Sequence, residues 1–431
     1  MSEMMQVPDG WEEKKLGEVV KIAIGGTPDR DNSDYWDSQK ISHNLWVSIR
    51  DLNKKIIDGT EEYISDLGVL NSNVKKIAKG TILMSFKLSI GKLAFADRDL
   101  YTNEAIAALT PNGKLDNLYL YYGLHFWDLL AEVDQAVKGA TLNIEKIKKI
   151  VIFYPQEKKE QEKIVRIFST LDKTIEATNS IIEKEKNIKK ALMQELLING
   201  IDKDGHIRSP QTHTYKESEL GLIPEEWEVD KLNEVTKLMT DFVANGSFES
   251  LADNVTVFET PDFAYYVRLV DIRKGLGHEK QTYVDELSFN FLKKSSLIGR
   301  EILIANIGAN VGETFLMPIL NKPATIAPNM IVVKVNNKII PEFLFYFLTF
   351  YKGISELQNV TEGSGQPKIN KTKLKTINVL IPSIKEQEKI INILTIQDKK
   401  IETEETNLAK LKELKKGLMS DLLSGKVRVT V

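Results

Sequence analysis

The sequence lacks several features that would narrow its function at once. It contains no cysteine, which excludes disulfides and thiolate metal sites and fits a reducing compartment. No stretch approaches the roughly 18 consecutive apolar residues of a membrane-spanning helix. The N-terminal segment MSEMMQVPDGWEEKK has no apolar core of the kind that signal peptides carry. These absences predict a soluble, cytoplasmic protein without a membrane partner.

The chain also lacks an excess of basic charge. Its 58 Lys and Arg residues are balanced by 61 Asp and Glu, which gives a formal net charge of −3. Non-specific polyanion binders are usually strongly basic, so this balance argues against that class. It leaves open a DNA binder with local basic faces. With 431 residues, 42% of them hydrophobic, the chain is long enough for several domains with a large core.

The familiar catalytic and cofactor motifs are missing as well. The five histidines form no HExxH or other metal-ligand spacing. The sequence has no GxxxxGK[ST] loop, no GxGxxG after a strand, no GxSxG elbow and no Asn/Asp-Pro-Pro-aromatic motif of amino-methyltransferases. We therefore predict a non-catalytic chain with no catalytic residues, no metal ligands and no cofactor of its own.

What the chain does contain is a duplication of itself. From Glu160 to Leu197, every residue aligns without a gap to the residue 226 positions later, and about half of the pairs are identical. The similarity extends more loosely to earlier segments, where 7–20 pairs with 223–236 and 142–155 pairs with 369–382. Because the landmarks keep the same order in both halves, we infer an internal duplication and a pseudo-two-fold symmetric molecule.

The most similar segments predict two long helices. Pro155 and Pro382 suit helix entrances, and the apolar residues that follow recur at three- and four-residue steps among Lys and Glu. A narrow apolar seam on a charged helix is typical of a coiled coil, and the simplest partner of each seam is the other copy. The principal seam residues are Ile164, Phe168, Leu171, Ile175, Ile182, Leu192, Ile390, Leu394, Ile401, Leu408, Leu411 and Leu418, and the same spacing includes Ile188, Leu196, Leu414 and Leu422.

The segments before the helices predict mixed domains. Short, turn-bounded apolar runs such as TILMSF and EILIANI indicate strands, whereas 117–133 and 341–357 have the length and aromatic faces of helices. The predicted fold is α+β, with two similar α/β-mixed domains separated by two long helices that form an antiparallel coiled coil. The expected boundaries are 1–156 for the first domain, 157–199 for the central helix, 200–222 for a linker, 223–383 for the second domain, 384–425 for the C-terminal helix and 426–431 for a tail.

Polar residues at the predicted hairpin tips are candidates for reading DNA bases. They are Ser85, Lys87, Ser89 and Lys92 in the first half, and Asn306 and Asn310 in the second. Asn can pair with adenine, Lys with guanine, and Ser with several base edges. Such residues are more often simple turn formers. The tips differ between the halves while the flanking strands match in type, which suits one framework that reads two targets.

Two further sets are candidates for contacts to the DNA backbone. The Gly-rich loops 139–143 and 363–370, which carry Thr141 and Gln366, could approach phosphates through backbone N–H groups. A plain surface turn is an equally open interpretation. Basic residues at the ends of the paired segments WVSIRDL and YVRLVDI form the other set, with solvated strand ends as the alternative. These residues are Arg50, Lys54, Lys55, Arg268, Arg273 and Lys274.

Four short motifs mark the chain in order. They are P-x-x-W-x-x-x-x-L at 8–16 and 224–232, I-G-K at 90–92, the E-Q-x-x-I helix starts that follow Pro155 and Pro382, and L-M-x-x-L-L at 192–197 and 418–423. Together they resemble the specificity subunit of type I restriction-modification systems, over essentially the whole chain. One departure is Glu313, which stands where the family pattern has a basic residue, so a phosphate contact at Lys92 is not expected at Glu313.

The resemblance implies a protein that recognises double-stranded DNA. Each of two target recognition domains is expected to read half of an asymmetric, bipartite site, and the paired helices are expected to set the spacing and to dock two modification subunits. The resemblance implies that those partners bind S-adenosylmethionine and methylate adenine N6, and that a restriction and translocase subunit uses ATP and Mg. The main alternative is a non-catalytic coiled-coil scaffold with two protein-binding domains; a self-contained enzyme is less favoured.

Overall fold

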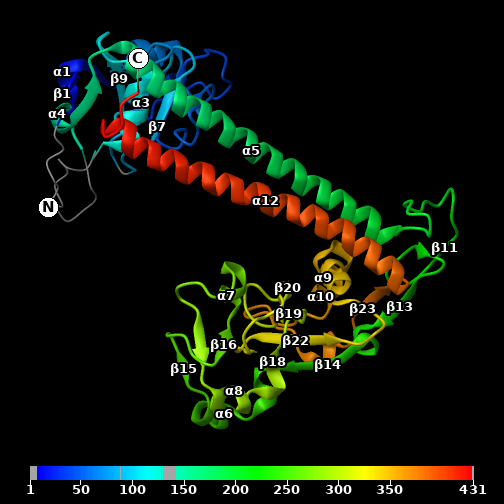
Figure 1. The fold of residues 1–431 in the computed structure, drawn as a ribbon. Coiled ribbons are helices and arrows are strands. Elements are labelled where there is room, and N and C mark those ends of the chain that lie inside the picture. Colours follow the sequence, from blue (N-terminus) through cyan, green and yellow to red (C-terminus); the bar gives the residue numbers. More distant parts are fainter. Residues whose placement is uncertain (1–6, 88, 128, 130–141, 430–431) are drawn as a thin grey trace. The chain divides into compact units, whose positions relative to one another are not determined.

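The computed structural model describes residues 7–87, 89–127, 129 and 142–429, and the chain divides into two compact units. Unit 1 comprises Met1–Ser180 and Glu405–Val431, and unit 2 comprises Ile181–Glu404. Each unit therefore contains one globular domain and part of each long helix, α5 (Lys158–Ile198) and α12 (Ile384–Leu423) (Figure 1). Among the described residues, no helix has both the length and the apolar character needed to cross a membrane.

The domain of unit 1 is built from ten strands and four short helices among the described residues. The strands are β1 Trp11–Lys15, β2 Val20–Ile24, β3 Leu45–Val47, β4 Ile56–Ile57, β5 Glu62–Tyr63, β6 Ile82–Ser85, β7 Leu93–Ala96, β8 Tyr101–Thr102, β9 Ile106–Pro111 and β10 Val151–Pro155. The helices are α1 Leu16–Val19, α2 Asp66–Leu70, α3 Asn117–Phe126 and α4 Ile144–Lys149.

The domain of unit 2 repeats this plan with additions. Its strands are β11 Tyr215–Lys216, β12 Ile223–Pro224, β13 Glu228–Lys231, β14 Thr236–Asp241, β15 Val257–Phe258, β16 Ala264–Val267, β17 Thr282–Val284, β18 Ser296–Leu297, β19 Ile302–Ala305, β20 Thr314–Leu316, β21 Ala324–Ile326, β22 Met330–Val335 and β23 Asn378–Ile381. Its helices are α6 Phe248–Asn254, α7 Leu269–Lys274, α8 Glu286–Phe291, α9 Pro341–Thr349, α10 Tyr351–Asn359 and α11 Lys371–Leu374.

The two domains share one sheet order. The main sheet has the order β2-β9-β6-β7-β4 in unit 1 and β14-β22-β19-β20 in unit 2, and the four equivalent strands are antiparallel in both. A second sheet in each domain contains an equivalent parallel pair, β3 with β8 and β16 with β21. The α+β class and the two similar domains that the repeat predicts are confirmed.

The central strands are apolar throughout because both faces of the main sheet are covered. Along β6, Ile82 and Met84 pack into the cluster that includes α3, whereas Leu83 packs into the cluster under the second sheet. Along β19, Ile302 packs into the cluster that includes α9, whereas Leu303 packs into the cluster under the second sheet. Since successive side chains of a strand point to opposite faces, a strand buried on both sides shows a continuous apolar run.

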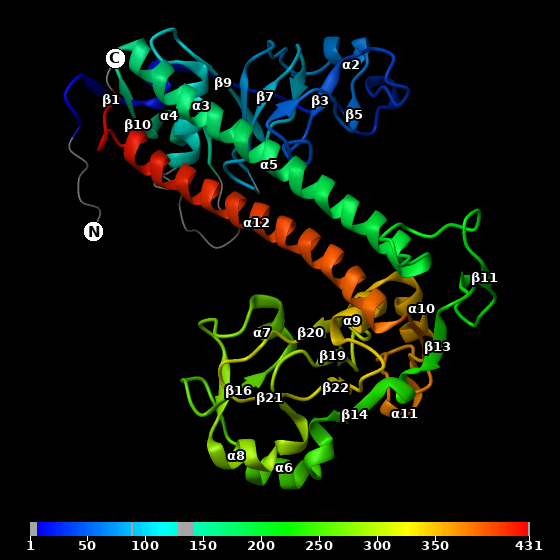
Figure 2. The same ribbon diagram turned by 45° about the vertical axis from the view of Figure 1, so that its right-hand side comes forward.

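The long helices lie side by side within each unit and run in opposite directions (Figures 1 and 2). Of the twelve principal seam residues, half are buried, namely Ile164, Phe168, Ile182, Ile390, Leu394 and Ile401. The other six, Leu171, Ile175, Leu192, Leu408, Leu411 and Leu418, are half-buried. Ile188 and Leu414 are 46% and 51% exposed, so their assignment to the seam is wrong.

The ends of each seam pack into the globular domains rather than only against the other helix. Ile164 and Phe168 belong to the core of unit 1, together with Leu422 from the end of α12. Ile390 and Leu394 belong in the same way to the core of unit 2, together with Leu196. The core of each domain therefore contains the beginning of the long helix that follows the domain and the end of the other long helix.

Two expected helices differ from the prediction. The segment 341–357 forms two helices, α9 and α10, because Phe350 between them is extended (φ −88°, ψ 156°) and buried. Gly353 packs so tightly on the end of α9 that a Cβ there would lie 2.1 Å from Phe347 O. In the first half, α3 ends at Phe126 and the Trp127 ring turns back onto Gly123; of the expected helix beyond it, 128 and 130–133 lie outside the described residues.

A buried glutamine at the start of each long helix ties it to the preceding domain. The Gln161 side chain is fully buried and makes three hydrogen bonds to main-chain groups of unit 1, at 2.7–3.1 Å. Gln387 makes the three equivalent bonds in unit 2, at 2.8–3.1 Å. A buried amide left without these partners would be costly, which explains why the E-Q pair of the repeat is the same in both copies.

An ion-pair layer joins the two helices inside each unit. In unit 1, Asp172 of α5 accepts hydrogen bonds from Lys415 of α12 (2.5 Å), Tyr122 (2.8 Å) and Lys55 (3.0 Å). Burial alone raises the pKa of Asp172, but these three hydrogen bonds outweigh burial and hold the pKa below its ordinary value. In unit 2, Asp398 occupies the equivalent position and pairs with Lys189 at 2.5 Å.

The lowered pKa of Asp172 predicts a pH-dependent contribution to stability. Because the folded-state pKa lies below the ordinary value of 3.8, the contribution is fully present above that value and is lost as the pH falls through the folded-state pKa. We expect Asp172→Asn to destabilise unit 1 by roughly 1–3 kcal/mol at neutral pH and by progressively less below pH 3.8. Urea unfolding of both proteins across this range measures the difference, and a pH-independent difference would contradict the assignment.

Candidate nucleic-acid interface

The candidate base readers lie at one end of the main sheet in each unit. In unit 1, β2 and β6 end there and β9 and β7 begin there, because Ile24 pairs with Ala107, Ser85 with Ile106, and Met84 with Leu93. In unit 2, the equivalent end is formed by β14, β22, β19 and β20. Loops from four strands therefore converge at each sheet end.

Ser85 does not serve as a base reader. Its side chain is fully buried at the end of β6. The Ser85 hydroxyl donates to the carbonyl oxygen of Ser89 and accepts from Lys92 N–H at 3.0 Å. The predicted DNA contact is wrong because both hydrogen-bonding directions of the hydroxyl are used inside the hairpin, whose shape Ser85 holds.

The other tip residues of the first half are accessible. Ser89 and Lys92 are exposed, and Lys87 is half-buried. Gly91 has φ +86°, a backbone conformation that residues other than glycine rarely adopt. Its N–H donates to Ser85 O at 2.9 Å. The I-G-K hairpin is thus a tight turn that presents Lys92 and Ser89 to solvent, and their roles as DNA contacts stay predictions.

The hairpin tip and the Gly-rich loop of the second half lie together. Gly308 N–H donates to Pro367 O and Ile369 N–H donates to Asn306 O, each at 2.9 Å. Asn310 and Gln366 are exposed. The Asn306 side-chain oxygen is buried and has no hydrogen-bond partner among the described residues. Two sets that were separate in the sequence therefore form one polar surface in unit 2.

The first half has the equivalent junction. Leu142 N–H donates to Phe86 O at 3.1 Å, which matches the bond from Ile369 to Asn306 in unit 2. Thr141, a predicted DNA contact, lies outside the described residues. The part of this loop that the structure describes therefore reaches the hairpin as its counterpart does.

The basic candidates are largely neutralised by carboxylates. Arg268 stands between the end of β16 at Val267 and the start of α7, and its guanidinium donates to the fully buried Asp271 at 2.8–2.9 Å. This cation compensates a buried anion while its side chain stays 36% exposed, and its phosphate contact stays a prediction. Arg273 and Lys274 lie on α7 itself, both exposed, and Arg273 pairs with Glu313. Arg50 follows β3 and is 77% exposed beside Glu61.

The pair formed by Arg273 and Glu313 explains the departure from the family pattern. Glu313 stands directly before β20, as Lys92 stands directly before β7 in the first half. Hydrogen bonding to Glu313 raises the pKa of the Arg273 guanidinium. The second tip is therefore tied to α7 by an ion pair, and its remaining polar groups are neutral amides.

Sequence inspection missed two residues at these sheet ends. Glu104, exposed in the loop before β9, accepts a hydrogen bond from the Thr27 hydroxyl. Asn329, exposed before β22, has φ +74° and accepts from Asn306 N–H at 3.1 Å. Neither stands at a predicted hairpin tip. The two residues could be found only from the strand order, in which β9 lies next to β6 and β22 lies next to β19.

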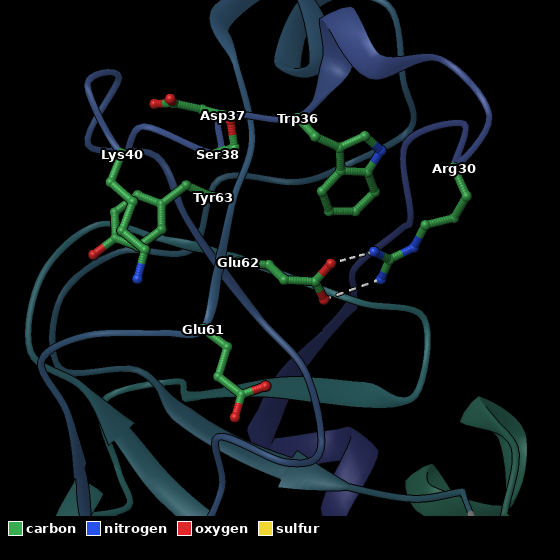
Figure 3. Close-up of a pocket in the computed structure, with 8 residues that line it drawn as sticks. All are labelled: Arg30, Trp36, Asp37, Ser38, Lys40, Glu61, Glu62 and Tyr63. Carbon is green, nitrogen blue, oxygen red and sulfur yellow. Dashed lines mark hydrogen bonds and ion pairs between the residues drawn. The ribbon is translucent and has the colours of Figure 1, made fainter.

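The loop that presents Thr27 is rigidly supported. A Cβ at Gly25 would lie 1.8 Å from Thr102 O, so only glycine fits there. The Arg30 guanidinium stacks on the Trp36 ring at 3.9 Å and forms two hydrogen bonds to Glu62. Figure 3 shows these side chains around a pocket of about 260 Å³. The Arg30 cation in this pocket already has a carboxylate partner in Glu62.

The described residues contain no group of three or more His, Asp or Glu side chains placed to hold a metal ion. The arrangement offers instead hydrogen-bond donors and acceptors on two matched sheet ends. Such groups read base edges and contact phosphates without changing a covalent bond. Two equivalent frameworks that present different polar groups define a protein that recognises two different stretches of a polymer such as DNA.

Comparison with known proteins agrees with this class. A family model described as "Type I restriction modification DNA specificity domain" matches residues 8–186 and 224–413. The chain belongs to this family and carries two copies of the domain. The predicted family, and with it a DNA-recognition chain rather than an enzyme, is confirmed; the scaffold alternative is not supported.

Some relatives and solved structures match almost the whole chain, and others match part of it. The type I restriction enzyme MjaIX specificity subunit of Methanocaldococcus jannaschii is 24% identical over 98% of this chain and 95% of its own. The EcoR124I/EcoR124II specificity subunit of Escherichia coli is 30% identical over 39% of this chain and 42% of its own. The type I S subunit structure from M. genitalium has a TM-score of 0.56 at 15% identity, covering 100% of this chain and 99% of that one, and thus shares the fold.

Proposed function

We propose that this chain reads a bipartite, asymmetric DNA site, with one domain for each half-site. The observation that carries the proposal is the pair of equivalent sheet ends with different polar groups: Glu104 and Lys87 in unit 1 against Asn306 and Asn329 in unit 2. Base edges in the major groove differ in their donor and acceptor patterns. Two frameworks of one design with different groups would therefore select two different sequences.

The proposal includes partner subunits that carry the chemistry. Two modification subunits would dock on the paired helices, bind S-adenosylmethionine and methylate adenine N6, while a restriction and translocase subunit would use ATP and Mg. The supporting observations are the absence of catalytic motifs in the sequence and a related structure described in the context of "complex assembly" of the type I system. The complex would act in the cytoplasm, where the DNA is.

Adenine-methylation mapping of the source genome tests the proposal. The expected result is a motif of two short, different half-sites separated by a gap of fixed length. Disruption of the gene for this chain is expected to abolish that motif alone. A genome whose methylated adenines do not depend on this chain would contradict the proposal.

We further predict that the isolated chain binds DNA weakly and that tight binding needs the complex. The net charge of −3 and the pairing of Arg268 and Arg273 with carboxylates leave little uncompensated positive charge for phosphates. The electrostatic part of DNA affinity grows with the number of phosphates neutralised. Fluorescence anisotropy with the mapped site at physiological salt measures the affinity, and nanomolar specific binding by the chain alone would contradict the prediction.

A further inference from the structure

Glu104 lies in an unusual place for a carboxylate, on the surface predicted to face DNA. It is exposed in the loop before β9, and the first residue of β9, Ile106, pairs with Ser85 at the end of β6. Phe86 N–H donates to Ala105 O at 3.0 Å, so Lys87 and Glu104 are the next neighbours across these strands. A carboxylate near phosphates is repelled, and its presence there is useful only if it accepts a hydrogen bond from the DNA.

The Glu104 carboxylate is held in one orientation. The Thr27 hydroxyl donates to its Oε2 atom, which leaves Oε1 as an acceptor. Thr27 itself is fixed by Gly26, whose N–H donates to Thr102 O at 2.9 Å and whose carbonyl oxygen accepts from the buried Trp46 indole at 3.0 Å. A fixed acceptor loses little conformational entropy when it binds, which favours specific recognition.

The carboxylate is also kept ionised with a cation at its side. The hydrogen bond from Thr27 lowers the pKa of Glu104, and the charges of Lys87 and Arg30 lower it further. Among the described residues, no salt bridge occupies either Glu104 or Lys87, whereas Arg30 is engaged by Glu62. An anionic acceptor and a cationic donor therefore stand next to each other at the end of the sheet.

We propose that Glu104 and Lys87 together read one C·G base pair of the first half-site in the major groove. Glu104 accepts the N4–H of cytosine, and Lys87 donates to O6 or N7 of guanine. These groups lie side by side on the edge of a C·G pair, and carboxylate and ammonium are the side chains that suit them. The inference rests on the proposed function and assigns one position of its DNA target.

The second unit supplies a contrast. There the equivalent register positions hold Ile307 and Pro328, because Ala305 pairs with Met330 as Ser85 pairs with Ile106. The carboxylates Asp241 and Glu313 at that sheet end are engaged by Lys371 at 2.8 Å and by Arg273. A carboxylate beside an ammonium group, neither of them in a salt bridge among the described residues, is thus a property of the first domain, and we expect the C·G position in one half-site only.

Methylation mapping of strains that carry single variants tests the inference. Glu104→Gln, which is isosteric and keeps an acceptor for Thr27, is expected to lower the preference for C·G at one position by about tenfold or more. Lys87→Met is expected to relax the same position. Asn306→Ala identifies the other half-site, and Glu145→Gln, an exposed carboxylate on α4 paired with Lys148, is the matched control that leaves the motif unchanged.

An unchanged motif in both variants would overturn the inference, and so would effects of the two variants at two different positions. Loss of all methylation would also overturn it if the variants keep the wild-type melting temperature and are therefore folded. A wild-type half-site without any C·G pair would do so as well. These outcomes differ from failure of the proposed function, in which the wild-type chain itself directs no bipartite motif.

Discussion

Arg208→Met is expected to destabilise unit 2 by about 3–5 kcal/mol, because it leaves a buried carboxylate without its cation. The Arg208 and Glu386 side chains are each only 7% exposed and are joined by two hydrogen bonds, one of them 2.5 Å long. Apart from the bonds to Arg208, the Glu386 side chain accepts one hydrogen bond among the described residues, from Ile201 N–H at 2.8 Å. Methionine matches the length of arginine but cannot compensate the charge.

Hydrogen exchange at the core strands measures this effect within one molecule. In Arg208→Met, the free energy of exchange of the β22 amides in unit 2 is expected to fall by the full loss of stability, about 3–5 kcal/mol. The β9 amides in unit 1 are expected to keep their protection. Equal losses in both units would mean that the variant perturbs the whole chain and would contradict the local account.

The repeat supplies a matched control for Arg208. Arg428 pairs with Glu160 in unit 1 as Arg208 pairs with Glu386 in unit 2, but the Arg428 side chain is 42% exposed. Its partner Glu160 is nevertheless only 3% exposed, so Arg428→Met also leaves a buried carboxylate without its cation. It is expected to cost a comparable amount but to affect β9 instead of β22. Arg50→Met, in a pair that is 77% and 68% exposed, should have no measurable effect on either strand.

The sequence predicted those parts of the fold that depend on local patterns. The helix seam around Ile164 and Ile390, the apolar strands β6 and β19, and the turn at Gly91 all follow from spacing along the chain. The break at Phe350 could not be predicted in this way. It results from the close approach of Gly353 to the end of α9, a tertiary contact that leaves no periodic signal.

The candidate interface was predicted only in part, and for the same reason. Lys87, Lys92 and Asn310 were found because they stand at hairpin tips. Ser85 was misassigned because burial cannot be read from its position beside the turn. Glu104 was missed because its partner Thr27 lies 77 residues away in sequence, and the strand order β2-β9-β6 is what brings the two together.

Removal of four residues from each long helix is expected to shorten the gap between the half-sites without changing either half-site. Both α5 and α12 run without interruption from one unit into the other. Four residues correspond to about 6 Å of helix and to slightly more than one turn, so the seam stays nearly in phase. At about 3.4 Å for each base pair, the expected change is a gap shorter by about two base pairs.

The contacts between the helices determine where to cut. Asp172 meets Lys415, and Lys189 meets Asp398, so the positions halfway between these layers are 179–182 and 405–408. Deletion of Asn179–Ile182 together with Glu405–Leu408 removes equivalent segments of both copies at one level and leaves both ion-pair layers in place. Deletion of only one segment is the control, because it shifts one helix against the other and is expected to destabilise the pair.

Methylation mapping of the deletion strain then gives a direct answer. If the helices set the spacing, both half-sites keep their sequences and only the number of bases between them falls. An unchanged gap with intact methylation would show that the spacing is determined within the domains or by the partner subunits. The two half-sites serve as internal controls, since the sheet ends that we propose read them lie outside the deleted segments.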